Sequence, residues 1–277
     1  MNNQFLNCSG KLISLEKSLI MGILNITPDS FFDGDRYTVE PAWLKHTEKM
    51  LAEGADIIDV GCISTRPGAK AIDENEEIRK TITVLSSLIK NFPEIIISVD
   101  TYRAKVANEA VNAGAAIIND ISGGMMDLQM YQTIARLNIP YILMHIQGTP
   151  ETMQQNPSYQ DVTKEIINFF SDKTNQLRLM GINDIIIDPG FGFGKTQEHN
   201  FQLLREMHLF KFVQHPLLIG ISRKSMIWKR LNSSPEEALN GTTVLNTIAL
   251  LKKADILRVH DVKEAKECLK LIDNMTI

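Results

Sequence analysis

A short apolar run that ends in polar residues occurs eight times along the chain, and a segment with helical periodicity follows each run. Such runs are typical of parallel strands that are covered on both faces. Regular alternation of strands and helices predicts a parallel sheet, and eight repeats favour its closure into a (β/α)8 barrel, the TIM-barrel architecture. A doubly wound open sheet is the alternative, although that architecture does not require eight repeats. The expected strands are 19–24, 55–60, 95–99, 116–118, 140–144, 185–187, 217–221 and 256–259.

The length of the chain and its N-terminal segment set the domain prediction. Barrels of this kind commonly reach 277 residues as a single domain, so we expect one domain over 1–277. Residues 4–18 alternate weakly between apolar and polar positions and contain turn residues at 8–10. We therefore expect 1–18 to form a small hairpin or cap ahead of the barrel.

Composition excludes several classes of partner. The chain has 29 Lys and Arg against 33 Asp and Glu, a net charge of −4, so we expect no binding to nucleic acid or to an anionic membrane surface. No apolar run is long enough to cross a bilayer, and the N-terminus does not resemble a signal peptide. Three widely spaced cysteines predict neither a disulfide framework nor a zinc site. These features predict a cytoplasmic protein that acts on small molecules.

Polar side chains stand at the end of every expected strand. The active site of a (β/α)8 barrel lies at the C-terminal ends of its strands, so these residues are the first candidates for a site. Strand ends are also polar in general because loops meet water there, and on that view Asp59 and His145 only pair with neighbouring backbone. A complete ring of amide, carboxylate and basic groups favours a ligand site instead. Its members are Asn25, Asp59, Asp100, Asn119, His145, Asp188, Ser222, Lys224, Arg258 and His260.

The glycine-rich segment 190–196 resembles a nucleotide-binding loop but matches neither standard pattern. A phosphate-binding loop requires glycine where Pro189 stands, and a dinucleotide fingerprint requires glycine where Lys195 stands. We expect a tight loop that passes close under a flat ligand. A Schiff-base aldolase would place a lysine on a strand, whereas Lys224 follows its strand, and the histidine spacing does not fit a zinc hydrolase.

Seven sequence motifs together resemble the dihydropteroate synthase family of pterin-binding enzymes. They are 21–31 (MGILNITPDSF), 64–68 (STRPG), 98–101 (SVDT), 118–120 (IND), 188–195 (DPGFGFGK), 222–224 (SRK) and 258–262 (RVHDV). They extend from the first expected strand to the last, in the order of the family. The resemblance implies a transferase of folate biosynthesis that joins 6-hydroxymethyl-7,8-dihydropterin diphosphate to 4-aminobenzoate and releases diphosphate. It also implies a homodimer that requires Mg²⁺ and is a target of sulfonamide drugs.

The same resemblance assigns roles to individual residues. It implies that Asp100, Asn119 and Asp188 bind the hydrogen-bonding edge of the pterin, and that Lys224 binds acceptor atoms of the ring. It implies that Thr65, Arg258 and His260 complete the pterin diphosphate site. It implies that Asn25 binds Mg²⁺. The implied catalytic residues are Asp100, Asp188, Lys224 and Arg66. The implied aminobenzoate pocket consists of Phe31, Thr65, Arg66, Pro67, Ser222 and Lys224.

Two loops, 27–38 and 62–75, are expected to close over the site and exclude water. The second loop contains Cys62, where the family more often has glycine, and the first contains Phe32 and Asp35, where smaller residues are common. We expect these departures to alter loop closure and sulfonamide affinity rather than the core of the site.

Two other functions remain open on these residues. A pterin-binding methyltransferase that serves a corrinoid protein shares the acidic and amide groups but needs no diphosphate site. Arg258, His260 and the 64–68 motif therefore favour the synthase. A catalytically silent pterin-binding paralogue is expected to have lost some of the site residues, all of which are present here.

Overall fold

The computed structural model describes residues 5–26, 41–62, 72–273 and 275. Within this part of the chain, eight parallel strands form one sheet in the order β8-β7-β6-β5-β4-β3-β10-β9. The sheet closes because the N–H of Ile187 donates to the carbonyl of Pro216 (2.9 Å) and Ile187 pairs with Leu217. The (β/α)8 barrel is therefore confirmed and the open sheet is excluded. The strands are β3 (Leu19–Asn25), β4 (Ile57–Gly61), β5 (Ile97–Asp100), β6 (Ile117–Asp120), β7 (Tyr141–Met144), β8 (Ile185–Asp188), β9 (Leu218–Ile219) and β10 (Ile256–Val259).

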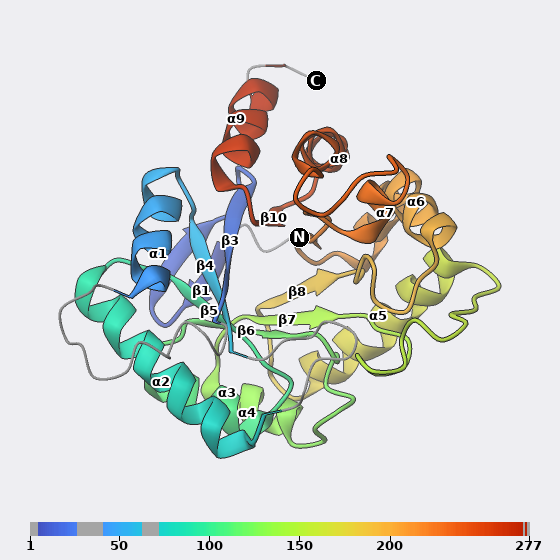
Figure 1. Ribbon diagram of the computed structural model, residues 1–277. Coiled ribbons are helices and arrows are strands. Elements are labelled where there is room, and N and C mark those ends of the chain that lie inside the picture. Colours follow the sequence, from blue (N-terminus) through green and yellow to red (C-terminus); the bar gives the residue numbers. More distant parts are fainter. Residues whose placement is uncertain (1–4, 27–40, 63–71, 274, 276–277) are drawn as a thin grey trace.

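Helices lie around the outside of the strands (Figure 1). Capping side chains stabilise the first turn of several helices. The carboxylate of Asp73, for example, accepts from the N–H groups of Asn75 and Glu76 at the start of α2. The helices are α1 (Ala42–Ala52), α2 (Glu74–Asn91), α3 (Ala104–Asn112), α4 (Met130–Leu137), α5 (Val162–Leu179), α6 (Gln197–Arg205), the 3₁₀ helix η2 (Met207–Val213), α7 (Ser225–Trp228), α8 (Leu239–Leu251) and α9 (Val262–Asp273).

The region around the seventh strand differs from the sequence prediction. The expected strand 217–221 is reduced to β9, because the chain turns directly afterwards and the N–H of Lys224 donates to the carbonyl of Ile221. In the same region α8 begins only at Leu239, after a turn that starts near Pro235. The short helices η2 and α7 have no counterpart in the prediction, since one or two helical turns carry too little periodicity to be recognised.

The barrel interior is apolar at the N-terminal ends of the strands. Side chains near the strand starts, such as Ile57 and Leu218, pack in one cluster with Leu6 and Cys8 of an N-terminal hairpin. That hairpin consists of the antiparallel strands β1 (Phe5–Cys8) and β2 (Lys11–Ser14). Leu6 is 0% exposed. The hairpin therefore plugs the barrel at the end opposite the predicted site, and the expected N-terminal cap is confirmed.

The interior becomes polar toward the C-terminal ends of the strands. Parallel pairing places Asp59 of β4 beside Ser98 of β5, and it places Asp100 beside Asn119 of β6. The side chains of Asp59 and Asp100 both meet that of Arg258 from β10. Closure of the sheet thus gathers charged groups from distant parts of the chain above an apolar base.

No helix in the described ranges is long and apolar enough to span a membrane. The cysteines Cys8, Cys62 and Cys268 are buried and free of disulfide bonds. Burial raises the pKa of the Cys62 thiol to about 11, which makes it an unreactive, packed residue at the start of the second expected loop.

Candidate active site

Arg258 lies at the centre of a hydrogen-bonded cluster inside the barrel. Its Nε donates to Oδ2 of Asp59 (2.6 Å), and its Nη2 donates to Oδ2 of Asp100 (3.0 Å). The same Oδ2 atom of Asp59 accepts from Nδ2 of Asn119 (3.1 Å). Strands β10, β4, β5 and β6 each contribute one side chain, although Asp59 and Arg258 are 199 positions apart in the chain.

Asp188 and Lys224 form a second group of opposite charges beside this cluster. Oδ1 of Asp188, at the end of β8, accepts from the N–H of Gly190 (2.8 Å). A Cβ atom added to Gly220 would lie 4.0 Å from Oδ2 of Asp188, 4.0 Å from Nζ of Lys224 and 3.9 Å from Cβ of Arg258. Because Gly220 has no side chain, these charged residues can face one another across it.

The ammonium of Lys224 is held by the glycine-rich loop, residues 190–195. Its Nζ donates to the carbonyl of Phe191 and lies 4.5 Å from the ring centroid of Phe193, a cation–π contact. Burial lowers the pKa of Lys224 to about 8, although the carboxylate of Asp188 opposes this shift. Lys224 is therefore mostly charged at pH 7 and loses its proton in mildly alkaline solution.

A second lysine, Lys195, anchors the glycine-rich loop to the end of β7. Its Nζ donates to the carbonyl of Phe193 (2.9 Å), to Nδ1 of His145 (3.1 Å) and to the carbonyl of His145 (3.3 Å). Lys195 is 3% exposed, and burial lowers its pKa. Gly190 has a φ of +68°, and a Cβ atom there would overlap the carbonyl oxygen of His145. The loop is tight, as predicted, because glycine and lysine together pack it on the neighbouring strand end.

Ser222 orients the imidazole of His260. The hydroxyl of Ser222 lies 3.0 Å from Nδ1 of His260 and accepts from the backbone N–H of the same residue (3.2 Å). Burial, reinforced by the charge of Arg258, lowers the pKa of His260 to about 4, so the ring is neutral near pH 7. A hydroxyl that donates to Nδ1 leaves the ring proton on Nε2. In that tautomer His260 offers an N–H donor from Nε2, and it carries no positive charge.

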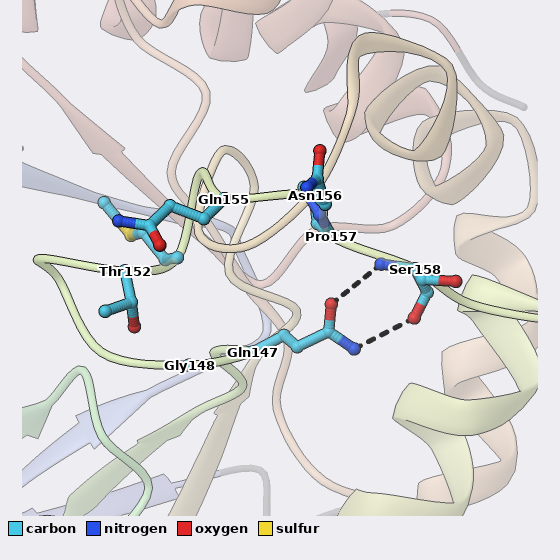
Figure 2. Close-up of a pocket in the computed structure, with 8 residues that line it drawn as sticks. Gln147, Gly148, Thr152, Gln155, Asn156, Pro157 and Ser158 are labelled. Carbon is cyan, nitrogen blue, oxygen red and sulfur yellow. Dashed lines mark hydrogen bonds between the residues drawn. The ribbon is translucent and has the colours of Figure 1, made fainter.

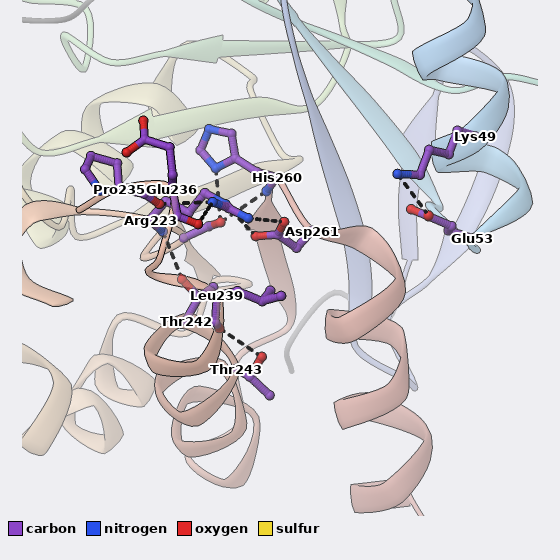
Figure 3. A network of polar contacts seen from close by, with 11 residues as sticks. Lys49, Glu53, Arg223, Pro235, Glu236, Leu239, Thr242, Thr243, His260 and Asp261 are labelled. Atoms are coloured by element: carbon purple, nitrogen blue, oxygen red, sulfur yellow. Dashed lines mark hydrogen bonds and ion pairs between the residues drawn. The ribbon is translucent and has the colours of Figure 1, made fainter. Parts of the chain in front are cut away.

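Arg223 has a structural role between two site residues. Its Nε and Nη2 donate to the two carboxylate oxygens of Asp261 (both 2.8 Å). Its Nη1 donates to the carbonyls of Pro235 (3.0 Å) and Glu236 (2.9 Å). Figure 3 shows Arg223 close to Asp261 and to the turn that precedes α8. This clamp joins the segments after β9 and β10, which carry the hydroxyl–imidazole pair.

The two carboxylates nearest the barrel mouth keep free acceptor atoms. Oδ1 of Asp100 and Oδ2 of Asp188 accept no hydrogen bond from the described residues. Burial raises the pKa of both side chains, while Arg258 opposes the rise at Asp100 and Lys224 opposes it at Asp188. Such an arrangement suits a flat heterocycle that presents N–H donors to the carboxylates and acceptor atoms to Lys224.

Asn25 is the described residue that best fits the expected Mg²⁺ site. It ends β3 with an exposed side chain, and its Oδ1 lies 3.4 Å from the position that a Cβ of Gly61 would occupy. Within the described ranges, no group of three or more His, Cys, Asp or Glu residues is arranged to hold a metal ion. Mg²⁺ commonly binds through one or two protein oxygens together with waters and substrate phosphates. A single carboxamide oxygen at the barrel mouth is compatible with that mode.

Comparison with known proteins decides the family. A sequence model of the family described as "Pterin binding enzyme" matches residues 21–260. The chain is 41% identical over 266 residues to the dihydropteroate synthase of Escherichia coli K12, covering 95% of this chain and 94% of that one. The chain belongs to the dihydropteroate synthase family.

Solved structures of the family agree with the fold. A crystal structure of Yersinia pestis dihydropteroate synthase with a sulfonamide drug has a TM-score of 0.90 at 39% identity and covers 98% of each chain. A Xanthomonas albilineans dihydropteroate synthase with 4-aminobenzoic acid also has a TM-score of 0.90, at 35% identity, covering 99% of this chain and 98% of that one.

Most of the implied dihydropteroate synthase residues meet at one end of the barrel. Those that contribute to the interior cluster, or to the segments after β9 and β10, are Asp100, Asn119, Asp188, Ser222, Lys224, Arg258 and His260. Phe31, Thr65, Arg66 and Pro67 lie outside the described residues. Their roles, and the closure of the two expected loops, stay predictions.

The family resemblance assigned no role to two residues of this cluster, Asp59 and Lys195. Asp59 was a member of the expected ring of strand-end residues, with pairing to backbone as the alternative, and it binds the side chains of Arg258 and Asn119. Its position at an expected strand end was the available signal. Lys195 had no comparable signal, because its partners lie on the end of β7 and meet it only after the glycine-rich loop folds back.

The loop after β7 forms a separate cavity of about 350 Å³ (Figure 2). The carboxamide of Gln147 joins two parts of this loop, since Nε2 donates to the carbonyl of Ser158 (2.9 Å) and Oε1 accepts from the N–H of Ser158 (3.0 Å). The lining residues are Gln147, Gly148, Thr152, Met153, Gln155, Asn156, Pro157 and Ser158. None of the candidate active-site residues at the C-terminal ends of the strands lines this cavity, so it is distinct from the candidate active site.

Proposed function

We propose that the chain catalyses the dihydropteroate synthase reaction of folate biosynthesis. The amino group of 4-aminobenzoate attacks the methylene carbon of 6-hydroxymethyl-7,8-dihydropterin diphosphate. One C–O bond breaks, one C–N bond forms, diphosphate leaves, and the amine nitrogen loses one proton to solvent. The observation that carries this proposal is the set of acids, amide and cations that converge inside the barrel: Asp100, Asn119, Asp188, Lys224 and Arg258.

The pterin binds through its hydrogen-bonding edge. The free oxygen atoms of Asp100 and Asp188 accept from the N–H groups of the ring, and Asn119 contributes its carboxamide. Lys224 donates to a ring acceptor. Burial strengthens each of these hydrogen bonds, because water cannot compete for the same groups.

The carboxylates also favour the reaction itself. As the C–O bond lengthens, positive charge develops on the methylene carbon and the adjoining ring, and Asp100 and Asp188 stabilise that charge. Arg258 is already paired with Asp59 and Asp100, so its positive charge is largely compensated. Its Nη1 has no partner among the described residues and binds one oxygen of the leaving group. His260 adds a neutral N–H donor. The described cations therefore stabilise departing diphosphate only in part.

A magnesium ion would supply the additional positive charge that the leaving diphosphate needs. Asn25 would hold Mg²⁺ through its carboxamide oxygen, and the ion would supply Lewis-acid stabilisation of the leaving group. We expect Asn25→Ala to raise the Mg²⁺ concentration needed for half-maximal activity, measured by titrating Mg²⁺ at saturating substrates. An unchanged Mg²⁺ requirement would remove Asn25 from the metal site.

We further propose that the protein is a homodimer of the cytoplasm. Val244 and Leu251, seven positions apart on one face of α8, are 50% and 40% exposed, and exposed apolar side chains of this kind support contact with a second copy. Three free cysteines suit a reducing compartment. Sedimentation analysis should give a dimer for the unmodified protein and a monomer for the Val244→Glu, Leu251→Glu double variant. A monomeric unmodified protein would contradict the assignment.

The reaction is tested with the purified protein, the pterin diphosphate and Mg²⁺, with and without 4-aminobenzoate. We expect diphosphate release to depend on 4-aminobenzoate and to match dihydropteroate formation. Lys224→Ala and Asp188→Ala should abolish it. Lys263→Ala, which removes an exposed lysine from α9, is the matched control and should retain full activity. A sulfonamide should compete with 4-aminobenzoate.

Two other outcomes would redirect the assignment. Pterin binding without product under any condition would favour a catalytically silent pterin-binding protein. Methyl transfer from methyltetrahydrofolate to a corrinoid acceptor, without diphosphate release, would favour the methyltransferase alternative.

A further inference from the structure

Asp59 lies one layer below the residues that can touch a ligand. It sits in β4 two positions before Gly61, so both residues project to the inside of the barrel, with Asp59 deeper. Gly61 pairs with Asp100, whereas Asp59 pairs with Ser98. Asp59 is 0% exposed. Any effect of Asp59 on a bound ligand must therefore act through the residues that cover it.

Those residues are Arg258 and Asn119, and one oxygen atom of Asp59 holds both. Oδ2 of Asp59 accepts from Nε of Arg258 at 2.6 Å and from Nδ2 of Asn119 at 3.1 Å. The two donors come from β10 and β6, on opposite sides of β4 along the sheet. A shift of this single carboxylate would move both of them.

The chemistry of a carboxylate also decides which way the Asn119 side chain points. An ionised carboxylate only accepts hydrogen bonds, so the NH₂ group of Asn119 must face Asp59. The carbonyl oxygen Oδ1 of Asn119 must then face away from Asp59. This orientation does not depend on how the nitrogen and oxygen atoms are assigned, because the reversed amide would bring two acceptor atoms together. A ligand above Asn119 therefore meets an acceptor at Oδ1 and gains most from an N–H group.

Folding stability does not explain the burial of this carboxylate. Oδ1 of Asp59 is buried and has no hydrogen-bond partner among the described residues, and the same is true of the hydroxyl of Ser98. An unpaired buried carboxylate oxygen is unfavourable for folding. A buried ion pair is often no more stabilising than apolar residues of the same volume. What Asp59 does provide is the orientation of two side chains next to the ligand.

We propose that Asp59 is a positioning residue that makes the barrel selective for a ligand with an N–H donor opposite Asn119. It does so by fixing Oδ1 of Asn119 toward the ligand and by holding Arg258 between Asp59 and Asp100. The inference rests on the proposed function, which makes this ligand the dihydropterin ring.

The first test compares Asp59→Asn with the unmodified protein. The variant keeps the shape of the side chain but offers Asn119 either a donor or an acceptor, so the amide of Asn119 is free to reverse. We expect the dissociation constant of the pterin diphosphate, measured by titration calorimetry with Mg²⁺, to rise by about tenfold to a hundredfold. Thermal unfolding should show a midpoint close to that of the unmodified protein, because Arg258 keeps its ion pair with Asp100. In the activity assay, KM should rise more than kcat falls.

Two further variants support this comparison. Asp59→Ser removes the carboxylate without adding an amide and should give a similar loss of affinity, so the inference does not depend on one substitution. Ser98→Ala is the matched control. It alters a neighbouring buried polar side chain that has no described hydrogen bond to the site, and it should bind the pterin diphosphate with unchanged affinity.

A double-mutant cycle separates positioning from a general structural role. If Asp59 acts through Asn119, then Asp59→Asn should cost clearly less affinity in an Asn119→Ala background than in the unmodified protein. If the fold-losses of pterin diphosphate affinity in the two single variants multiply in the double variant, Asp59 does not act through Asn119. Unchanged affinity of Asp59→Asn would overturn the inference outright. In both cases the proposed function stands, provided that the unmodified protein binds the pterin diphosphate and forms dihydropteroate. Failure of the unmodified protein to do so would refute the proposed function itself.

Discussion

Gly190→Ala offers a direct test of how the glycine-rich loop supports Lys224. Gly190 has a φ of +68°, its N–H donates to Oδ1 of Asp188, and an added Cβ would overlap the carbonyl oxygen of His145. The obstacle is backbone, which cannot rotate away as a side chain can. The loop must therefore move, and with it the carbonyl of Phe191 that binds Lys224.

Gly181 provides a matched control on the outside of the barrel. It follows α5 with a φ of +86°, and no atom lies within 4 Å of the position that its Cβ would occupy. Alanine at Gly181 should cost about 1–2 kcal/mol, the usual penalty of a left-handed backbone with a side chain. Gly190→Ala should cost the same penalty plus about 1–3 kcal/mol for overpacking. The effect of alanine on the unfolded chain is equal in both variants and cancels in the comparison.

Urea unfolding followed by circular dichroism measures the two penalties, and calorimetry measures binding of the pterin diphosphate. We expect Gly190→Ala to unfold at a lower urea concentration than Gly181→Ala and to bind the pterin diphosphate more weakly. Gly181→Ala should bind normally. Equal unfolding midpoints for the two variants would refute the close packing of the loop against β7. Normal binding by a destabilised Gly190→Ala would refute the link between this loop and Lys224.

Three other predictions follow from the geometry. Pterin affinity should fall as pH rises through about 8, because burial lowers the pKa of Lys224 to about 8 and the ammonium loses its proton there. Calorimetry across this pH range measures the fall. The Lys224→Met variant should bind the pterin weakly at every pH and show no such fall. Ser222→Ala removes the hydroxyl that orients His260, so the dissociation constant of the pterin diphosphate should rise about fivefold, the equivalent of one hydrogen bond, while that of the pterin alcohol, which lacks the diphosphate, should not change. Leu6→Ala should lower the free energy of unfolding by about 2–5 kcal/mol with an unchanged KM, since Leu6 plugs the opposite end of the barrel; an altered KM would contradict that separation.

The fold was predictable because its signals are local and repeated. Each strand is a short apolar run and each long helix has an amphipathic period, so eight repeats could be counted along the sequence. The prediction was weakest between 207 and 238, where η2, β9 and α7 are each too short to show a period. There the tertiary contacts, rather than local preference, decide where the chain turns.

The site was predictable in composition but not in its contacts. The rule that barrel sites occupy the C-terminal strand ends identified Asp100, Asp188 and Arg258 before any geometry was known. It could not reveal that Arg258 is shared between two carboxylates, nor that Lys195 anchors a loop to His145. These contacts join residues from different strands, and their distances depend on the closure of the whole sheet.

The amino-acid sequence by itself therefore determined the class of fold, the end of the barrel at which chemistry occurs and the kinds of groups present there. Periodicity and strand-end position are properties of neighbouring residues, so they can be read along the chain. The tertiary structure alone decided the direction of the Asn119 amide, the neutral state of His260 and the proton affinity of Lys224. Each of these depends on burial and on charges that are distant in sequence, because only the closed barrel removes water from the cluster and brings its members within hydrogen-bonding distance.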